Sequence, residues 1–138
     1  MSFLLRKLVT RLERTLSPIL GRLLYPSTGV NVLCWTDTKK NQAIVLEVDG
    51  NYHLPGGMAE QGEHPEKTAA REFKEETNLK VKINKFIGIK TRWNQIEALH
   101  LFYEGTLDDN FENNQQGWEG KPIIVDKEEI SHIIEELP

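Results

Sequence analysis

Three glutamates stand close together in a segment whose composition predicts a helix, Pro65–Thr77. Glu72, Glu75 and Glu76 lie three and four residues apart, so at 3.6 residues per turn Glu72 neighbours both of the others. Like charges at this spacing repel each other by about 0.2–0.5 kcal/mol per exposed pair. The cluster gathers carboxylate oxygens, which are the ligands that a hard cation such as Mg²⁺ prefers.

A glycine pair precedes this helix. Gly56 and Gly57 follow Leu54-Pro55, and without side chains they allow the backbone to approach a phosphate group closely and to present a free carbonyl oxygen. For the glutamates alone, a solvated acidic helix face is the simpler interpretation, because runs of charge are usually surface. The spacing of the whole segment decides between the two interpretations.

The segment from Gly57 to Leu79 reads G, five residues, E, seven residues, then R-E-F-K-E-E-T-N-L. This 23-residue pattern resembles the Nudix box, and so specific a spacing rarely arises by chance. All six fixed positions before the final glycine of that box match: Gly57, Glu63, Arg71, Glu72, Glu75 and Glu76.

Two positions depart from the family pattern. Phe73 replaces a small aliphatic residue, and we expect this aromatic ring to face the core and hold the helix against it. Asn78 replaces the final glycine. If that glycine is the left-handed cap of the helix, asparagine is the next best residue there, at a small cost in stability. Neither change removes a charged position, so neither indicates an inactive protein.

The resemblance implies a metal-dependent hydrolase in which water attacks a phosphorus of a diphosphate linkage. Mg²⁺, or alternatively Mn²⁺, would be bound by the three clustered glutamates and by the Gly56 carbonyl. Arg71 would orient a glutamate through a charge-assisted hydrogen bond, and Glu63 would support the metal ligands or pair with Arg71. The predicted metal ligands are therefore Gly56, Glu72, Glu75 and Glu76, and the predicted catalytic residues include Glu72, Arg71 and Glu63.

The general base is open between a glutamate of the box and one from a later loop. Glu112 and Glu119, in a polar loop spanning residues 107–120, are the loop candidates, and the alternative is that both are solvated surface acids. For substrate contacts we expect Gly56 and Gly57 together with His53 and Trp118. A surface position at a strand end is the alternative for His53. For stacking on a nucleobase, Trp118 is favoured over Trp93 and Tyr103. The alternative for all three is a role in the core or in anchoring a loop.

The elements that must position these residues alternate between strands and helices. Asn51–Leu54 is a predicted short strand, and Pro55-Gly56-Gly57 is expected to break regular structure. Further strands are predicted at Thr28–Trp35, Gln42–Asp49, Leu79–Arg92, Ile96–Thr106 and Pro122–Val125. A closing helix is predicted at Lys127–Leu137, with Asp126 as its N-cap. The fold class is α/β (α+β), and the resemblance implies an αβα sandwich around a mixed sheet.

Composition fits one ordinary globular domain. The chain has 138 residues with 38% hydrophobic and 28% charged residues, and its single cysteine, Cys34, excludes an intrachain disulfide. The net charge of −4 is unevenly distributed. Residues 1–25 hold five basic and one acidic residue, and the remainder holds 12 basic and 20 acidic residues. An acidic body does not suit general nucleic-acid binding, which needs Lys and Arg against phosphates.

The first 26 residues are predicted to form a separate amphipathic helical segment, with the Nudix domain at 27–138. Leucine, isoleucine and valine recur at helical spacing over residues 3–24, and Pro18 interrupts the pattern. Three uses of this basic helix are open. It packs on its own fold or in a homodimer, it lies on an anionic membrane surface, or it is a targeting segment. No apolar run approaches the ~20 residues of a membrane span, and we expect a cytoplasmic protein.

The expected substrate is a small nucleoside diphosphate derivative: a nucleotide sugar, ADP-ribose or a nucleoside triphosphate. Specificity lies in loops and cleft walls, so the box does not separate these classes. Two other functions remain open. One is a non-catalytic Nudix domain that only binds its ligand, and the other is a membrane-associated hydrolase of a lipid-linked diphosphate, suggested by the basic first helix.

Overall fold

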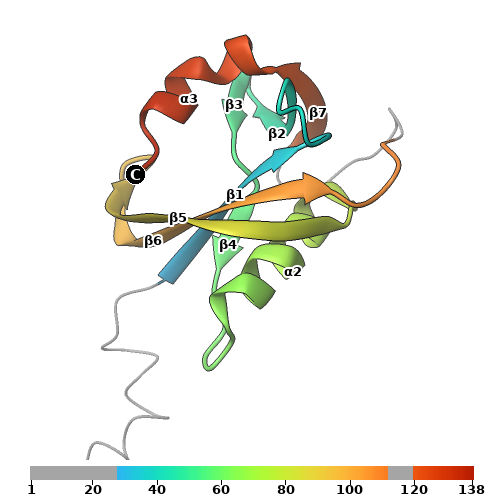
Figure 1. The fold of residues 1–138 in the computed structure, drawn as a ribbon. Helices are drawn as coiled ribbons and strands as arrows, with labels where there is room; N and C mark the ends of the chain where they lie inside the picture. The colour runs from blue at the N-terminus through green and yellow to red at the C-terminus, as the bar shows by residue number, and fades with distance from the viewer. Residues whose placement is uncertain (1–27, 112–119) are drawn as a thin grey trace, which may run out of the picture.

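The computed structural model describes residues 28–111 and 120–138. The predicted first helix and three site candidates, Glu112, Trp118 and Glu119, lie outside the described residues. Figure 1 shows the described part as a curved sheet with helices above and below it. No helix of this part is both long and apolar enough to cross a membrane.

Seven strands of the described residues form one mixed sheet. Its main path runs β3-β2-β1-β6-β5, with β4 added to β1 and β7 added to β2. β1 and β6 are parallel and the other pairs are antiparallel, as a mixed sheet requires. The strands are β1 (Thr28–Trp35), β2 (Gln42–Val48), β3 (Asn51–His53), β4 (Gly56–Met58), β5 (Val81–Trp93), β6 (Ile96–Leu107) and β7 (Lys121–Asp126).

β1 changes partner along its length. Its last residues, Cys34 and Trp35, pair with β2 as the predicted hairpin requires, whereas its first residues pair with β4. The expectation that Pro55-Gly56-Gly57 breaks regular structure is therefore wrong for the two glycines. A Cβ on Gly56 would lie 2.1 Å from the Val30 carbonyl oxygen, so the missing side chain is what lets β4 pair tightly with β1.

The helix α2 (Pro65–Thr77) has the predicted bounds. Pro65 occupies its first turn, where a missing N–H costs nothing, and the His64 imidazole Nδ1 accepts a hydrogen bond from the Glu66 N–H at 3.2 Å. The helix ends at Asn78, whose φ of 60° is left-handed. This confirms the cap expected where the family has glycine.

The second helical layer differs from its prediction. The segment expected as one helix from Lys127 to Leu137 is divided into a 3₁₀ turn, η1 (Lys127–Ile130), and a short α-helix, α3 (Ser131–Glu135). The Asp126 N–H is bonded to the Glu129 carboxylate at 2.8 Å, which fixes the start of the turn. Ile130 and Ile133 are both buried on the sheet, although the backbone changes from 3₁₀ to α geometry between them.

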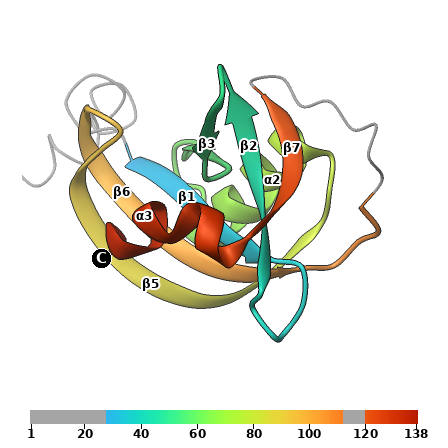
Figure 2. The same cartoon turned by 90° about the horizontal axis from the view of Figure 1, so that it is seen from above.

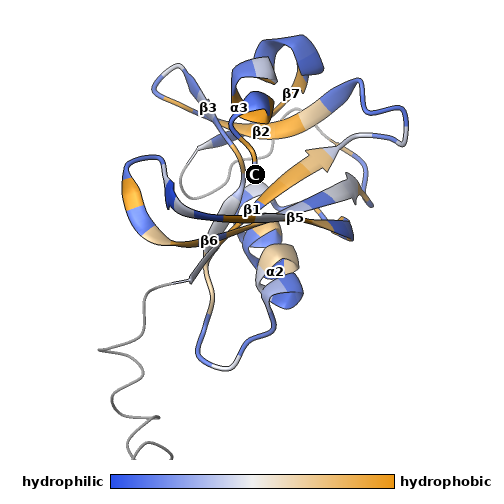
Figure 3. Cartoon of the chain, turned by 60° about the vertical axis from the view of Figure 1, so that its left-hand side comes forward, coloured by the Kyte–Doolittle hydropathy of each residue, from blue (hydrophilic) through white to orange (hydrophobic). Residues whose placement is uncertain are grey.

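The helical layers cover opposite faces of the sheet, which confirms the αβα sandwich (Figures 1 and 2). Hydrophobic residues run along β1 and β2 between them (Figure 3). The cluster under α2 contains Val30, Val32, Cys34, Ile44, Ala69, Phe73, Leu79 and Tyr103. The cluster under η1 and α3 contains Leu33, Trp35, Ala43, Val45, Leu54, Trp93, Phe102, Val125, Ile130 and Ile133. Phe73 is fully buried, as predicted.

Candidate functional site

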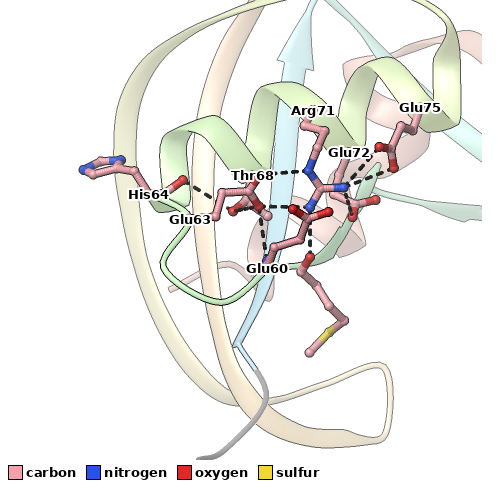
Figure 4. Close-up of polar contacts among 8 residues, drawn as sticks. Glu60, Glu63, His64, Thr68, Arg71, Glu72 and Glu75 are labelled. Carbon is pink, nitrogen blue, oxygen red and sulfur yellow. Dashed lines mark hydrogen bonds and ion pairs between the residues drawn. The ribbon is translucent and has the colours of Figure 1, made fainter. Parts of the chain in front are cut away.

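Arg71 lies at the centre of the carboxylate cluster (Figure 4). Its Nε and Nη2 donate to the two carboxylate oxygens of Glu63, both at 2.9 Å, which makes a bidentate ion pair. Its Nη1 donates to Glu72 at 2.8 Å and to both oxygens of Glu75 at 3.2 Å. One guanidinium therefore fixes three of the box glutamates, and its fork geometry gives the cluster a defined arrangement.

Glu63 is held firmly in its charged form. The paired Arg71 guanidinium, with further hydrogen bonds from the Thr68 hydroxyl at 2.7 Å and the Glu60 N–H at 3.3 Å, lowers the pKa of Glu63 to about 2. The same ion pair, foremost, raises the pKa of Arg71 above its usual range. Glu63 and Arg71 are thus both charged at any physiological pH, and the pair joins the loop before α2 to the helix itself.

Gly57 provides the space for the Glu72 side chain. A Cβ on Gly57 would lie 2.2 Å from the carboxyl group of Glu72, so any larger residue at this position would displace that carboxylate. The neighbouring Met58 carbonyl accepts a hydrogen bond from Arg71 Nη2 at 3.2 Å. The glycine strand β4 and the helix α2 are therefore in direct contact through residues of the box.

The three clustered glutamates have different surroundings. The Glu75 side chain is 56% exposed and the Glu72 side chain is 15% exposed. Glu76 is a buried residue, 7% exposed, although a buried carboxylate costs free energy unless it is compensated. Glu76 also lines a cavity, so this residue is buried without being enclosed in the hydrophobic core.

The donor set suits a hard divalent cation, because all the candidate ligands are oxygen atoms. Within residues 28–111 and 120–138, however, no three His, Cys, Asp or Glu side chains stand close enough to hold a metal ion as they are arranged. The Arg71 guanidinium instead forms ion pairs with Glu63, Glu72 and Glu75 in this arrangement. A cation that binds here must draw carboxylates away from the guanidinium.

A cavity of about 350 Å³ opens beside the glycine strand. Predicted site residues on its wall are His53, Gly56, Gly57 and Glu76. The wall also includes residues that the sequence did not indicate as site residues, among them Asn31 and Ile96. The signal for Asn31 was a polar residue within the apolar run Val30–Trp35. The described lining is Gly29, Val30, Asn31, Leu46, Val48, His53, Leu54, Gly56, Gly57, Met58, Glu76, Trp93, Asn94, Ile96 and His100.

Two of the aromatic residues considered for base stacking, Trp93 and Tyr103, are packed in the core. Trp93 is buried and packs edge-on against Phe102, with 4.9 Å between ring centroids. Tyr103 is buried in the α2 cluster and lies 5.3 Å from the Phe86 ring. Both are core residues, although Trp93 also reaches the cavity wall. His53 is half-buried at the end of β3, also on that wall.

A family model described as the NUDIX domain matches residues 27–136. The chain belongs to the Nudix family. The resemblance drawn from the box is thus confirmed, and the match extends over both helical layers and all the described strands.

Solved structures of Nudix proteins have the same fold. A NUDIX hydrolase from Nitrosomonas europaea matches with a TM-score of 0.62 and 21% identity, over 77% of this chain and 60% of that chain. A NUDIX-family hydrolase from Clostridium perfringens matches with a TM-score of 0.60 and 18% identity, over 79% and 87%. A UDP-X diphosphatase matches with a TM-score of 0.56 and 19% identity, over 86% and 58%. This chain thus spans less than two thirds of the first and last of these proteins.

Proposed function

We propose that this Nudix protein is a metal-dependent hydrolase that cleaves the diphosphate linkage of a nucleoside diphosphate derivative. The observation that carries the proposal is the position of the glutamate cluster, which Arg71 fixes on one side and whose buried member, Glu76, opens onto the cavity. A diphosphate at Gly56 and Gly57 meets the carboxylates, and the rest of the substrate extends into the cavity.

The metal ligands in this proposal are Glu72, Glu75, Glu76 and the Gly56 carbonyl, with Mg²⁺ or Mn²⁺ as the ion. When bound, such a cation neutralises phosphate charge and acidifies water. Arg71 orients Glu72, and Glu63 holds Arg71 in place. Because the pKa of Glu63 lies at about 2, this support does not titrate at physiological pH. The glycine strand leaves room for the phosphates.

The proton acceptor for the attacking water is either a glutamate of the box or one of Glu112 and Glu119. We expect Trp118 and His53 to contact substrate. The catalytic domain is residues 27–138, in the cytoplasm, and the basic residues 1–26 are used for a homodimer or a peripheral membrane contact. The substrate classes to compare are nucleotide sugars, ADP-ribose and nucleoside triphosphates, and one similar structure is that of a UDP-X diphosphatase.

The experiment is a hydrolysis panel of UDP-glucose, ADP-ribose and the nucleoside triphosphates, with Mg²⁺, Mn²⁺ or EDTA. A phosphatase-coupled step reveals monophosphate products. We expect turnover of at least one substrate that EDTA abolishes. Turnover that persists in EDTA would contradict metal dependence, and folded protein that binds panel members without hydrolysing them would favour a non-catalytic binding domain.

Glu76→Gln sharpens this test because it keeps the shape of the side chain and removes its charge. We expect kcat to fall by at least about a hundredfold, the scale for one charged group that stabilises a transition state. Glu66→Gln is the matched control, since Glu66 is an exposed glutamate in the first turn of the same helix. Equal rates in both variants would remove Glu76 from the proposed metal site.

A further inference from the structure

Two large apolar side chains of β5 are exposed on the face of the sheet that carries α2. Phe86 is 46% exposed and Ile89 is 51% exposed. On β6 they lie opposite Tyr103 and Leu101, which belong to the cluster under α2 or pack against it. Residues that lie opposite each other on paired strands share a face of the sheet. Phe86 and Ile89 therefore continue this apolar face beyond the part that α2 covers.

Half-buried leucines of β6 join these side chains into one apolar surface. Because side chains alternate along a strand, Leu99 lies on the same face as Leu101. Lys85 of β5 lies opposite Glu104 and points to the other face. Single exposed apolar residues are ordinary, whereas a contiguous apolar surface marks a contact site. We call this surface the β5 patch, and it consists of Phe86, Ile89, Leu99 and Leu101.

The chain that precedes the sheet enters beside this patch. β1 runs parallel to β6, and its first residue, Thr28, lies opposite Leu99 (Figures 1 and 2). Two residues further on, Val30 lies opposite Leu101, which pairs with Ile89 on its other side. Because neighbouring strands are about 4.8 Å apart, the residues directly before Thr28 begin next to the β5 patch.

Residues 16–25, with the sequence L-S-P-I-L-G-R-L-L-Y, are suited to cover this patch. Ser17 followed by Pro18 is the pattern of an N-cap and a first helical residue, which predicts a short helix from Pro18 to Tyr25. At 3.6 residues per turn this helix has one strongly apolar face. The residues on that face are Ile19, Leu20 and Leu23.

The lengths of the predicted helix and of the patch also match. A helix of residues 18–25 is about 12 Å long, and Phe86–Ile89 spans about 10 Å of β5. Pro26 and Ser27 join the helix to β1 and together reach about 7 Å. The helix therefore cannot lie far from the start of β1, where the patch is.

Charge complements this apolar match at one border of the patch. Burial, foremost, and the Glu66 carboxylate raise the pKa of Tyr103, whose ring centroid lies 5.3 Å from that of Phe86. Glu66, in the first turn of α2, thus lies near the Phe86 end of the patch. Residues 16–25 hold one charged residue, Arg22, and its charge is of the opposite sign.

We propose that residues 16–25 dock as a short amphipathic helix on the β5 patch of their own chain. The apolar face of the helix packs against Phe86 and Ile89, and Arg22 pairs with Glu66. This contact leaves residues 1–15, which hold four of the five basic residues of the segment, for the homodimer or membrane contact proposed above. The inference does not depend on hydrolysis, so the contact and the activity are tested separately.

Hydrogen–deuterium exchange of the whole chain, followed by mass spectrometry, tests this contact against a synthetic peptide of residues 1–27. We expect the amides of residues 19–25 to exchange at least about tenfold more slowly in the protein, because burial of large apolar side chains stabilises the docked helix. Ile89→Asp places a charge in the contact and returns these rates to within about twofold of the peptide. Ile124→Asp is the matched control and keeps the protection, because Ile124 is an exposed isoleucine of β7, which pairs with β2.

Leu20→Asp tests the contact from the side of the helix. Residue 20 precedes the matched domain of residues 27–136, so we expect this substitution to remove the protection of residues 19–25 without unfolding the domain. Leu5→Asp, which changes a leucine of residues 1–15, keeps the protection.

Exchange in the wild type at the rate of the peptide overturns the inference, and so does protection that both Ile89→Asp and Leu20→Asp retain. Protection that grows with protein concentration assigns the patch to a second copy of the chain. Protection that requires phosphatidylserine vesicles assigns residues 16–25 to a membrane surface. Either of these two results overturns docking within one chain.

Discussion

The two helical layers of the sandwich are built in different ways. Both ends of α2 are defined by residues of its own sequence. Pro65 lies in its first turn, and Asn78 adopts the left-handed conformation directly after its last residue. The layer of η1 and α3 changes from 3₁₀ to α geometry within nine residues, 127–135, and buries Ile130 and Ile133 on the sheet. α2 also carries the box glutamates, whereas the predicted site includes no residue of η1 or α3.

This difference indicates a division of roles. The geometry of α2 must be fixed, because Arg71 and the glutamates work only if the helix has a defined start, end and rotation. The opposite layer only has to cover the apolar face of the sheet, so its backbone follows the packing. Substitutions in the two layers are therefore expected to separate stability from catalysis.

The largest effect is expected from Phe73→Ala. Phe73 is fully buried between α2 and the sheet, so its truncation lowers the free energy of unfolding by about 3–5 kcal/mol. It also loosens the helix that carries the glutamates, so kcat falls in the molecules that remain folded. Urea unfolding and turnover corrected for the folded fraction measure the two effects.

Ile133→Ala is the matched variant in the other layer and costs about 2–5 kcal/mol, with kcat per folded molecule unchanged. An equal loss of kcat in both variants would contradict the division between the layers.

Glu63→Gln tests the ion pair that anchors α2 to the preceding loop. The pKa of Glu63 is lowered to about 2 in the fold, whereas an unfolded glutamate titrates near 4.3. The stabilisation is thus fully present above about pH 5 and is lost as pH falls toward 2. In EDTA, the Tm difference between wild type and variant should be largest at pH 6 and shrink toward pH 2. A Tm difference that does not change with pH would contradict the stabilisation of the Glu63 carboxylate by Arg71.

The smallest effect is expected from Asn78→Gly, which restores the residue of the family pattern. Glycine adopts the left-handed conformation with less strain than asparagine, so the free energy of unfolding should rise by less than about 1 kcal/mol, with kcat unchanged. Thermal unfolding measures the gain. A lower Tm would indicate that the Asn78 side chain, rather than its φ of 60°, stabilises the helix end.

The sequence predicted best what local chemistry controls. The bounds of α2 followed from Pro65 and Asn78, and the pairing of Arg71 with Glu63 and Glu72 was implied by the resemblance to the Nudix box. The break between η1 and α3 was missed because no glycine or proline marks it within residues 127–137. β4 was missed because the close approach of Gly56 to Val30 is a contact between separate segments.

In the candidate site, too, contacts between segments that are distant in sequence were not predicted. Asn31 was not predicted because its place on the cavity wall depends on how β1 pairs with β4 and β6. The positions of Glu112, Trp118 and Glu119 stay predictions from sequence. The family resemblance predicted the charged residues of the candidate site. The apolar residues of the cavity wall come together only through the three-dimensional pairing of the strands.

The long-range strand pairing also has a consequence for how the chain folds during synthesis. β2 pairs with β7, and its first residue, Gln42, lies opposite Asp126, 84 residues later. Contacts so distant in sequence form slowly, because a long loop must close before they provide any stabilisation. The sheet therefore cannot be completed until the β7 residues up to Asp126 have left the ribosome, although the glutamates on α2 are synthesised much earlier. Until η1 and α3 follow, the face of β1 and β2 that they cover stays exposed, and this interval is when the nascent protein is most open to aggregation.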